Sequence, residues 1–119
     1  MERIRFITHQ GKQILVVDLA HCSPAEVEKT LRAAPDCVTA QPLGSVLLLA
    51  DFTGATFNEE TVRVMKETAT FDKPYIRRTA WIGTQSLPDW FRKDVSDFSQ
   101  REFPVFKTRT DALEWLTKD

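Results

Sequence analysis

Three residue types that take part in nucleophilic catalysis stand next to one another at His21, Cys22 and Ser23. A nucleophile needs its base within hydrogen-bonding reach, whereas neighbouring side chains on an extended chain point to opposite sides. The sequence also contains no glycine-rich phosphate-binding loop and no Gly-x-Ser-x-Gly elbow. Cys22 is therefore interpreted as a small buried residue before a helix and His21 as a partly exposed loop residue, and no catalytic residue is predicted.

Two adjacent carboxylates, Glu59 and Glu60, precede an apolar helical stripe that starts at Val62. Acid–base catalysis by two carboxylates needs side chains that face each other, whereas adjacent helical residues diverge by about 100°. Negative side chains in a first helical turn instead complement the helix dipole. This helix follows an apolar strand, and the carboxyl ends of strands are where open α/β sheets meet ligands and partners.

The few cysteines and histidines indicate neither a metal site nor a disulfide. His9 and His21 are far apart in the sequence and there is no Cys-x-x-Cys pair, so no metal and no cofactor is predicted. Cys22 and Cys37 bracket a predicted helix of about eleven residues, whose ends lie about 16 Å apart. A disulfide needs Cα atoms within about 7 Å, so we expect two free thiols, which favours a reducing, cytoplasmic setting.

The charge balance excludes a general nucleic-acid footprint. The 119 residues include 16 basic and 17 acidic side chains, for a net charge of −1, so no nucleic-acid partner is predicted. Basic residues occur in pairs at Arg77–Arg78, Arg92–Lys93 and Lys107/Arg109, which are solvated edges unless the fold brings them together. No run approaches the roughly 20 apolar residues of a membrane span, and residues 1–5 lack the apolar core of a signal peptide.

Glycine and proline separate short periodic segments that position these residues. Strands are predicted at 3–8, 13–19, 46–50, 75–83 and 103–107, and helices at 24–34, 59–72 and 87–98, with a last helix capped by Thr108 or Thr110. The order ββαβαβαβα predicts an α/β fold in one domain, residues 1–119. Its five-stranded sheet is mixed, mostly parallel and packed with four helices, and the apolar segment 46–50 is the central strand.

The helix ends are predicted from capping residues and prolines. Ser23 and Glu26 form a capping box, and Pro35 is expected to stop that helix. Ser86 is the predicted cap of the third helix. In that helix three apolar residues are expected to face the core, and Trp90 is expected at the solvent edge of their stripe. The three are Phe91, Val95 and Phe98.

The predicted order, with the segment Leu47–Phe57 at its centre, resembles STAS domains, the SpoIIAA-like family of anti-sigma-factor antagonists. The similarity covers essentially the whole chain. It matches best the standalone bacterial SpoIIAA-like proteins, a branch also linked to the Sec14-type lipid-binding fold. The other segments that carry the resemblance are Val17–Pro24, Asp51–Phe57, Lys73–Tyr75 and Thr110–Leu116.

The resemblance implies a non-enzymatic regulatory module. Classical members bind a switch kinase through the loop and helix start after the third strand, and phosphorylation of a serine there breaks the complex. The family pattern is an aromatic or aliphatic residue, a hydrophobic residue, Asp, Ser, Ser and Gly. The corresponding residues of this chain are Phe57, Asn58, Glu59, Glu60, Thr61 and Val62.

Glu60 thus stands where the classical members carry the phosphorylatable serine. Its single negative charge cannot be added or removed, so we expect no phosphorylation switch at this position. Thr61 is the only adjacent hydroxyl and hence the candidate phosphosite, although a helical residue one step on points about 100° away.

These observations predict a STAS-like regulatory or protein-interaction module that works through residues 51–61, at the edge of the sheet where the central strand ends. The alternative is a small-molecule or lipid-binding protein with an apolar pocket beneath the helices 59–72 and 87–98, and a small hydrolase using Cys22 or Ser23 is the least favoured. The partner is a protein of unknown identity, and homodimerisation is left open. The predicted partner-binding residues are Asp51, Thr53, Asn58, Glu59, Glu60, Thr61 and Trp90.

Overall fold

The computed structural model describes residues 2–119 and confirms the predicted order of elements. The first hairpin and crossover comprise β1 (Ile4–His9), β2 (Lys12–Asp18) and α1 (Pro24–Thr39). They are followed by β3 (Val46–Asp51), α2 (Glu59–Asp72), β4 (Ile76–Ile82), α3 (Trp90–Ser99), β5 (Val105–Phe106) and α4 (Arg109–Thr117). Two short 3₁₀ turns, η1 (Lys73–Tyr75) and η2 (Thr84–Ser86), flank β4.

The strands form one mixed sheet in the order β1-β2-β3-β4-β5. Among the strands of residues 2–119, only the β1–β2 pair is antiparallel, and β3 is the central strand, as predicted. The last strand is shorter than predicted, because Pro104 has no backbone N–H to donate to β4. Its carbonyl oxygen accepts a hydrogen bond from the amide of Trp81 at 2.9 Å. β5 pairs with β4 at Trp81 and Ile82, so within residues 2–119 the outer edge of β4 from Ile76 to Ala80 has no strand partner.

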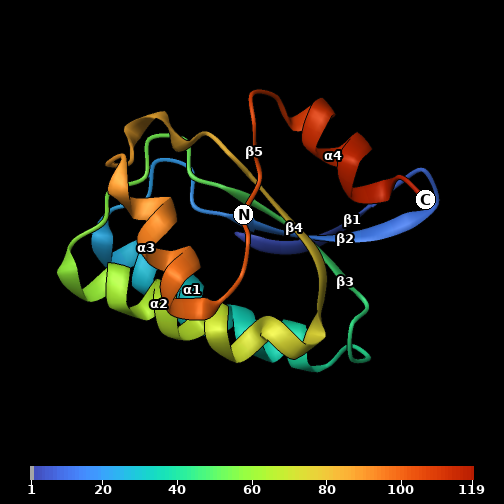
Figure 1. Ribbon diagram of the computed structural model, residues 1–119, viewed down its shortest axis with the longest axis horizontal. Coiled ribbons are helices and arrows are strands. Elements are labelled where there is room, and N and C mark those ends of the chain that lie inside the picture. The colour runs from blue at the N-terminus through green and yellow to red at the C-terminus, as the bar shows by residue number, and fades with distance from the viewer. Residues whose placement is uncertain (1) are drawn as a thin grey trace.

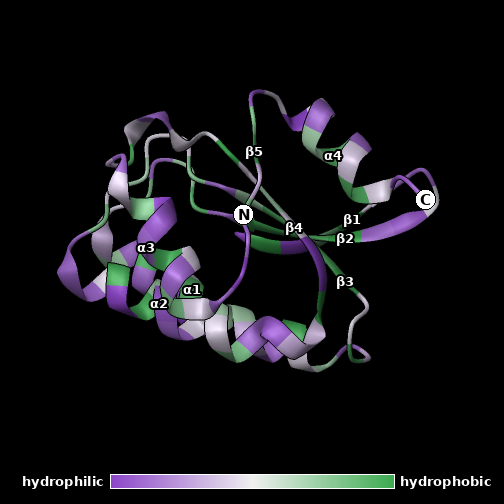
Figure 2. Cartoon of the chain, viewed as in Figure 1, coloured by the Kyte–Doolittle hydropathy of each residue, from purple (hydrophilic) through white to green (hydrophobic). Residues whose placement is uncertain are grey.

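Helices cover both faces of the sheet (Figure 1). α1, α2 and α3 lie on one face and α4 lies on the other, so the buried strands are apolar on both sides (Figure 2). In β2, for example, Val17 faces the three-helix layer and Val16 faces the α4 side. No helix among residues 2–119 combines the length and hydropathy needed to cross a membrane.

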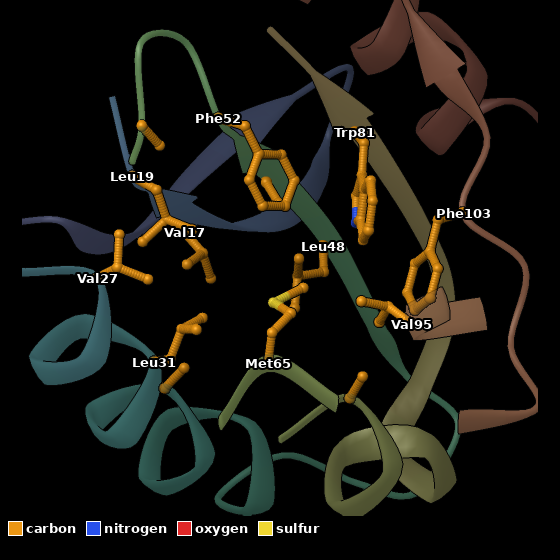
Figure 3. Close-up of a cluster of buried hydrophobic side chains, with 14 of the residues drawn as sticks. Val17, Leu19, Val27, Leu31, Leu48, Phe52, Met65, Trp81, Val95 and Phe103 are labelled. Atoms are coloured by element: carbon orange, nitrogen blue, oxygen red, sulfur yellow. The ribbon is translucent and has the colours of Figure 1, made fainter. Parts of the chain in front are cut away.

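Large side chains fill the space between the three helices and the sheet (Figure 3). Trp81 is fully buried, with its ring stacked on Phe103 at a centroid distance of 4.5 Å and tilted against Phe52 at 4.6 Å. Met65 of α2 packs against this layer from the helix side. The residual cavity there is about 40 Å³, enough for water but far too small for a lipid chain.

The prediction that Pro35 ends the first helix is wrong, because α1 continues for another turn to Thr39. An interior proline removes one backbone hydrogen bond at a cost of about 3 kcal/mol. Val38, in that last turn, is fully buried, and burial of a valine contributes about 1.5–3 kcal/mol. Tertiary packing therefore offsets the local penalty. The capping box of Ser23 and Glu26 is confirmed, and Cys22 and Cys37 are free thiols, as predicted.

The start and the apolar face of α3 also differ from the prediction. Ser86 does not cap α3, because Leu87 precedes a proline and is held extended, so the helix begins at Trp90. Phe91 and Val95 are buried as predicted, but Phe98 is 55% exposed. In the last turn of α3 the buried position is taken by Ser99 instead.

Candidate functional site

The loops that follow β2, β3 and β4 are bonded to one another at the carboxyl end of the sheet. The amide of His21 donates to the carbonyl of Thr53 at 2.7 Å, and the amide of Phe52 donates to the carbonyl of Ile82 at 2.9 Å. Gly83 has φ +70°, and a Cβ on it would lie 2.6 Å from the amide nitrogen of Thr53. The absence of a side chain at this glycine therefore lets the two loops pack directly.

An open groove of about 590 Å³ lies between the start of α2 and the segment that leads from η2 into α3. We call it the α2–α3 groove. It combines apolar residues from both sides with a few polar side chains at its margin. Its lining consists of Gly54, Ala55, Thr56, Phe57, Asn58, Glu59, Val62, Lys66, Ser86, Leu87, Pro88, Trp90, Phe91 and Asp94.

Aromatic side chains form the apolar part of the groove. The half-buried ring of Phe57 meets the fully buried ring of Phe91 edge to face at 4.7 Å, which fixes both in place. Trp90 is next to Phe91 at 6.3 Å but is 55% exposed, the position predicted for it at the solvent edge. The groove therefore presents the exposed parts of Trp90 and Phe57 as an aromatic surface that the fold itself leaves uncovered.

A charged pair bridges the two helices that flank the groove. Lys66 Nζ of α2 lies 2.7 Å from a carboxylate oxygen of Asp94 of α3. The same ammonium group lies 5.8 Å from the centre of the exposed Phe98 ring. These contacts hold α2 and α3 in a fixed relation, and they place one charge of each sign beside the apolar floor.

Three of the residues predicted to bind a partner, Asn58, Glu59 and Trp90, line this groove. Asp51 and Thr53 lie elsewhere on the same sheet end. One oxygen of Asp51 accepts from the amide and the hydroxyl of Thr53, at 3.0 and 2.7 Å, and the other lies 3.5 Å from Arg109 of α4. Asp51 therefore faces the α4 side of the sheet rather than the groove.

Glu60 and Thr61 also lie outside the groove. Glu60 is paired with Arg63 on its own helix, and Arg32 of α1 lies 3.7 Å away. Thr61 is 1% exposed, and its hydroxyl accepts from the amide of Asn58 at 2.7 Å while Asn58 Oδ1 accepts from the amide of Thr61 at 2.9 Å. The hydroxyl predicted as candidate phosphosite is therefore enclosed in a capping box and is not presented at the surface.

Sequence reasoning did not identify Val62, Lys66, Leu87 and Asp94 as groove residues. Val62 was assigned to the apolar stripe of its helix and Leu87 to the start of the next one. The alternative of a pocket beneath both helices did not identify which of their residues meet. That contact is long-range, so its residues become visible only in the fold.

Of the reactive residues before α1, Cys22 is buried and Ser23 caps the helix. Burial raises the pKa of the Cys22 thiol above its usual value, which keeps the thiol protonated and weakly nucleophilic at neutral pH. Among residues 2–119 no cluster of histidine, cysteine and carboxylate side chains could hold a metal ion.

Comparison with known proteins defines the class of fold. No protein-family model matches the chain, and no curated protein matches it. Its structure is similar to that of an uncharacterised protein of the DUF3478 family from Shewanella loihica, described as having a SpoIIAA-like fold. The two superpose with a TM-score of 0.72 over 95% of this chain and 91% of the other, at 19% sequence identity. This chain therefore has the SpoIIAA-like fold that its sequence predicted.

Proposed function

We propose that this protein is a non-enzymatic, STAS-like interaction module that binds a protein partner through the α2–α3 groove. The observation that carries the proposal is the half-exposed Trp90 beside a groove floored by Phe57 and Phe91. Exposed tryptophans next to concave apolar surfaces are typical anchors of protein–protein interfaces. The location, at the carboxyl end of the parallel strands, is also where this class of sheet meets its partners.

The chemistry of the groove indicates what the partner surface must offer. An apolar side chain that enters the groove would contact Phe57 and Trp90, while Glu59 and the Lys66–Asp94 pair would orient polar groups at the margin. Covering the exposed 55% of the Trp90 side chain contributes about 2–3 kcal/mol. This corresponds to a factor of about 30 to 150 in Kd.

We propose further that partner binding is not switched by phosphorylation at the usual position. Glu60 carries a permanent charge there, and the enclosed hydroxyl of Thr61 is bonded to Asn58. Modification of Thr61 would require the first turn of α2 to open. Binding is therefore constitutive or governed by another signal.

The alternative function, an apolar ligand held beneath the helices, would need far more enclosed space than residues 2–119 leave there. The space under α2 and α3 is about 40 Å³ and is bounded by Met65, Trp81 and Phe103. Pockets that enclose small molecules usually measure about 300–1,000 Å³. The packing thus favours an interaction surface over an internal ligand site.

The test is an affinity capture from the native host, with mass spectrometry of bound proteins and small molecules. Wild type is compared with Trp90→Ala and with Phe71→Ala, which removes a similarly exposed aromatic outside the groove. We expect wild type and Phe71→Ala to retain the same protein and Trp90→Ala to lose it. Retention of every protein by Trp90→Ala contradicts the proposal. Loss of self-association by Trp90→Ala alone, measured by sedimentation, would identify a second copy of the chain as the partner.

A further inference from the structure

We propose that a basic trough on the other side of α3 binds a compact molecule that carries two or more phosphate groups. The trough measures about 1020 Å³ and lies between β4, α3, the α3–β5 connection and α4. It is separate from the α2–α3 groove and shares no lining residue with it. Its six cations are Lys73, Arg77, Arg78, Arg92, Lys93 and Arg101.

The fold creates this concentration of charge from residues that are scattered in the sequence. The basic pairs Arg77–Arg78 and Arg92–Lys93 converge here, from β4 and α3 respectively. The lining contains two acidic residues, Asp89 and Glu102, so its formal charge is +4. The whole chain carries −1, so the rest of the molecule carries −5. The trough is a local positive site on an acidic protein.

Few of the trough cations form a close ion pair, although Asp72 lies near Arg101 and Asp119 lies near Arg77 and Arg78. Among residues 2–119, Lys93 is the only trough cation with an ion pair within 4 Å, to Asp97 at 2.7 Å. Lys73 and Arg92 donate instead to backbone carbonyls, each at 2.9 Å. Arg77 is exposed and forms none of these contacts. Carbonyl contacts position a cation without cancelling its charge, so the trough remains free to attract an anion.

Two further arginines are held in fixed positions at the trough wall. Arg78 donates to the carbonyl oxygens of Trp115 and Lys118, at 2.9 and 2.8 Å, and its guanidinium lies over the Trp115 ring. Arg101 donates to the carbonyl of Ala69 at 2.8 Å, with the buried carboxylate of Asp72 near it. Guanidinium groups suit phosphate because their planar forks match its oxygens. Because their geometry is set in advance, less entropy is lost when the anion binds.

The aromatic rings of the trough argue against a nucleobase. Phe103 has Arg101 over its ring at 4.9 Å and Trp81 stacked on it at 4.5 Å. Trp115 has Arg78 at 5.5 Å and Phe106 at 5.5 Å. These rings are occupied by the protein, so they offer no face for base stacking.

The charge distribution also argues against a long polymer. A nucleic acid that extended beyond the trough would run over a surface of net charge −5. A small ligand meets only the trough. Two phosphate monoesters carry about −3 to −4 together, which matches the +4 of the lining. The phosphate groups could belong to a free metabolite or to a lipid headgroup.

The experiment measures binding of tripolyphosphate to the intact protein by calorimetry, with amide chemical shifts to locate the site. The double variant Arg77→Gln/Lys93→Gln removes two trough cations with exposed side chains. The control Lys29→Gln/Lys107→Gln removes two exposed cations outside the trough, neither of which forms an ion pair within 4 Å among residues 2–119. Amide spectra of both variants verify that they are folded.

We expect one tripolyphosphate per chain, shifts confined to the trough, and affinity about tenfold weaker in the trough variant but unchanged in the control. Vesicles of phosphatidylcholine with phosphatidylinositol bisphosphate, whose headgroup carries several phosphate groups, distinguish the two phosphate sources. Vesicle binding that tripolyphosphate displaces assigns the site to a headgroup, and tripolyphosphate binding alone assigns it to a free ligand. The proposal is overturned by no binding at millimolar tripolyphosphate, by equal weakening in both variants, or by tighter binding of a single-stranded oligonucleotide.

Discussion

Replacing Asp72 by asparagine is expected to stabilise the protein at neutral pH. Asp72 ends α2 and is 4% exposed, and its Oδ1 has no hydrogen-bond partner among residues 2–119. Burial raises the pKa of Asp72 from 3.8 to about 6, although Arg101 opposes the shift. The fold therefore disfavours the ionised carboxylate, and asparagine has nearly the same shape without the charge.

The sign of the pH dependence follows from this shift. The pKa of Asp72 is higher in the folded state than in the unfolded state. The loss of folding stability that its ionisation causes is therefore absent below about pH 3.8 and fully present above about pH 6. With the pKa raised from 3.8 to about 6, ionised Asp72 lowers the free energy of unfolding by about 3 kcal/mol at pH 7.5 and by about 1 kcal/mol at pH 4.5. Arg101 keeps its bonds to Ala69 and Thr79 in the variant, and its own pKa, lowered by burial to about 10, leaves it charged.

The assay is urea unfolding of wild type, Asp72→Asn and the control Asp36→Asn at pH 7.5 and 4.5. Asp36 is exposed on α1, so its replacement should change the free energy of unfolding by less than about 0.5 kcal/mol. Asp72→Asn should raise that free energy at pH 7.5, and the gain should shrink to about a third at pH 4.5. Destabilisation at pH 7.5, or a gain that does not depend on pH, would refute the reasoning.

Three shorter predictions concern the core, the thiols and the loop contact. Leu48→Ala, in the central strand, should cost about 2–5 kcal/mol in urea unfolding, and a loss below about 1 kcal/mol would contradict its core position. Thiol titration of the denatured, unreduced protein should count two free thiols, and a monomer without free thiols would indicate a disulfide. In the native protein, Cys22 should react more slowly than the half-buried Cys37. Gly83→Ala should destabilise the fold by more than 1 kcal/mol, since its Cβ would meet Thr53, and an unchanged melting temperature would show that the loops yield easily.

Local signals in the sequence were sufficient where one short segment determines the structure. The Ser23–Glu26 capping box and the apolar β3 need no distant partner to be recognised, and both are confirmed. Local signals failed where packing between distant segments determines where a helix ends or which side chain is buried. Pro35 remains helical because Val38 is buried against the core, and Phe98 is exposed although its spacing from Phe91 is helical.

Some features of the candidate site were predictable from the sequence, and others depend on the fold. Asn58 and Glu59 were identified from the start of the helix after the central strand, and Trp90 from its place at the edge of an apolar stripe; all three line the α2–α3 groove. Thr61 was placed correctly on its helix, but the sequence does not reveal that its hydroxyl is bonded within the capping box. The convergence of the basic pairs depends on β4 and α3 lying beside one trough, which only the sheet order and the helix packing determine.

The short β5 has a consequence for self-association. A strand edge without a strand partner is a template on which another copy of a chain can add a strand, and within residues 2–119 β4 has no strand partner from Ile76 to Ala80. Arg77 and Arg78 stand on this edge within the trough of formal charge +4, so two copies that approach edge to edge repel each other. The same cations therefore oppose edge-to-edge aggregation of the chain. Neutralising them, by mutation or by excess polyanion, should make turbidity at high protein concentration rise faster.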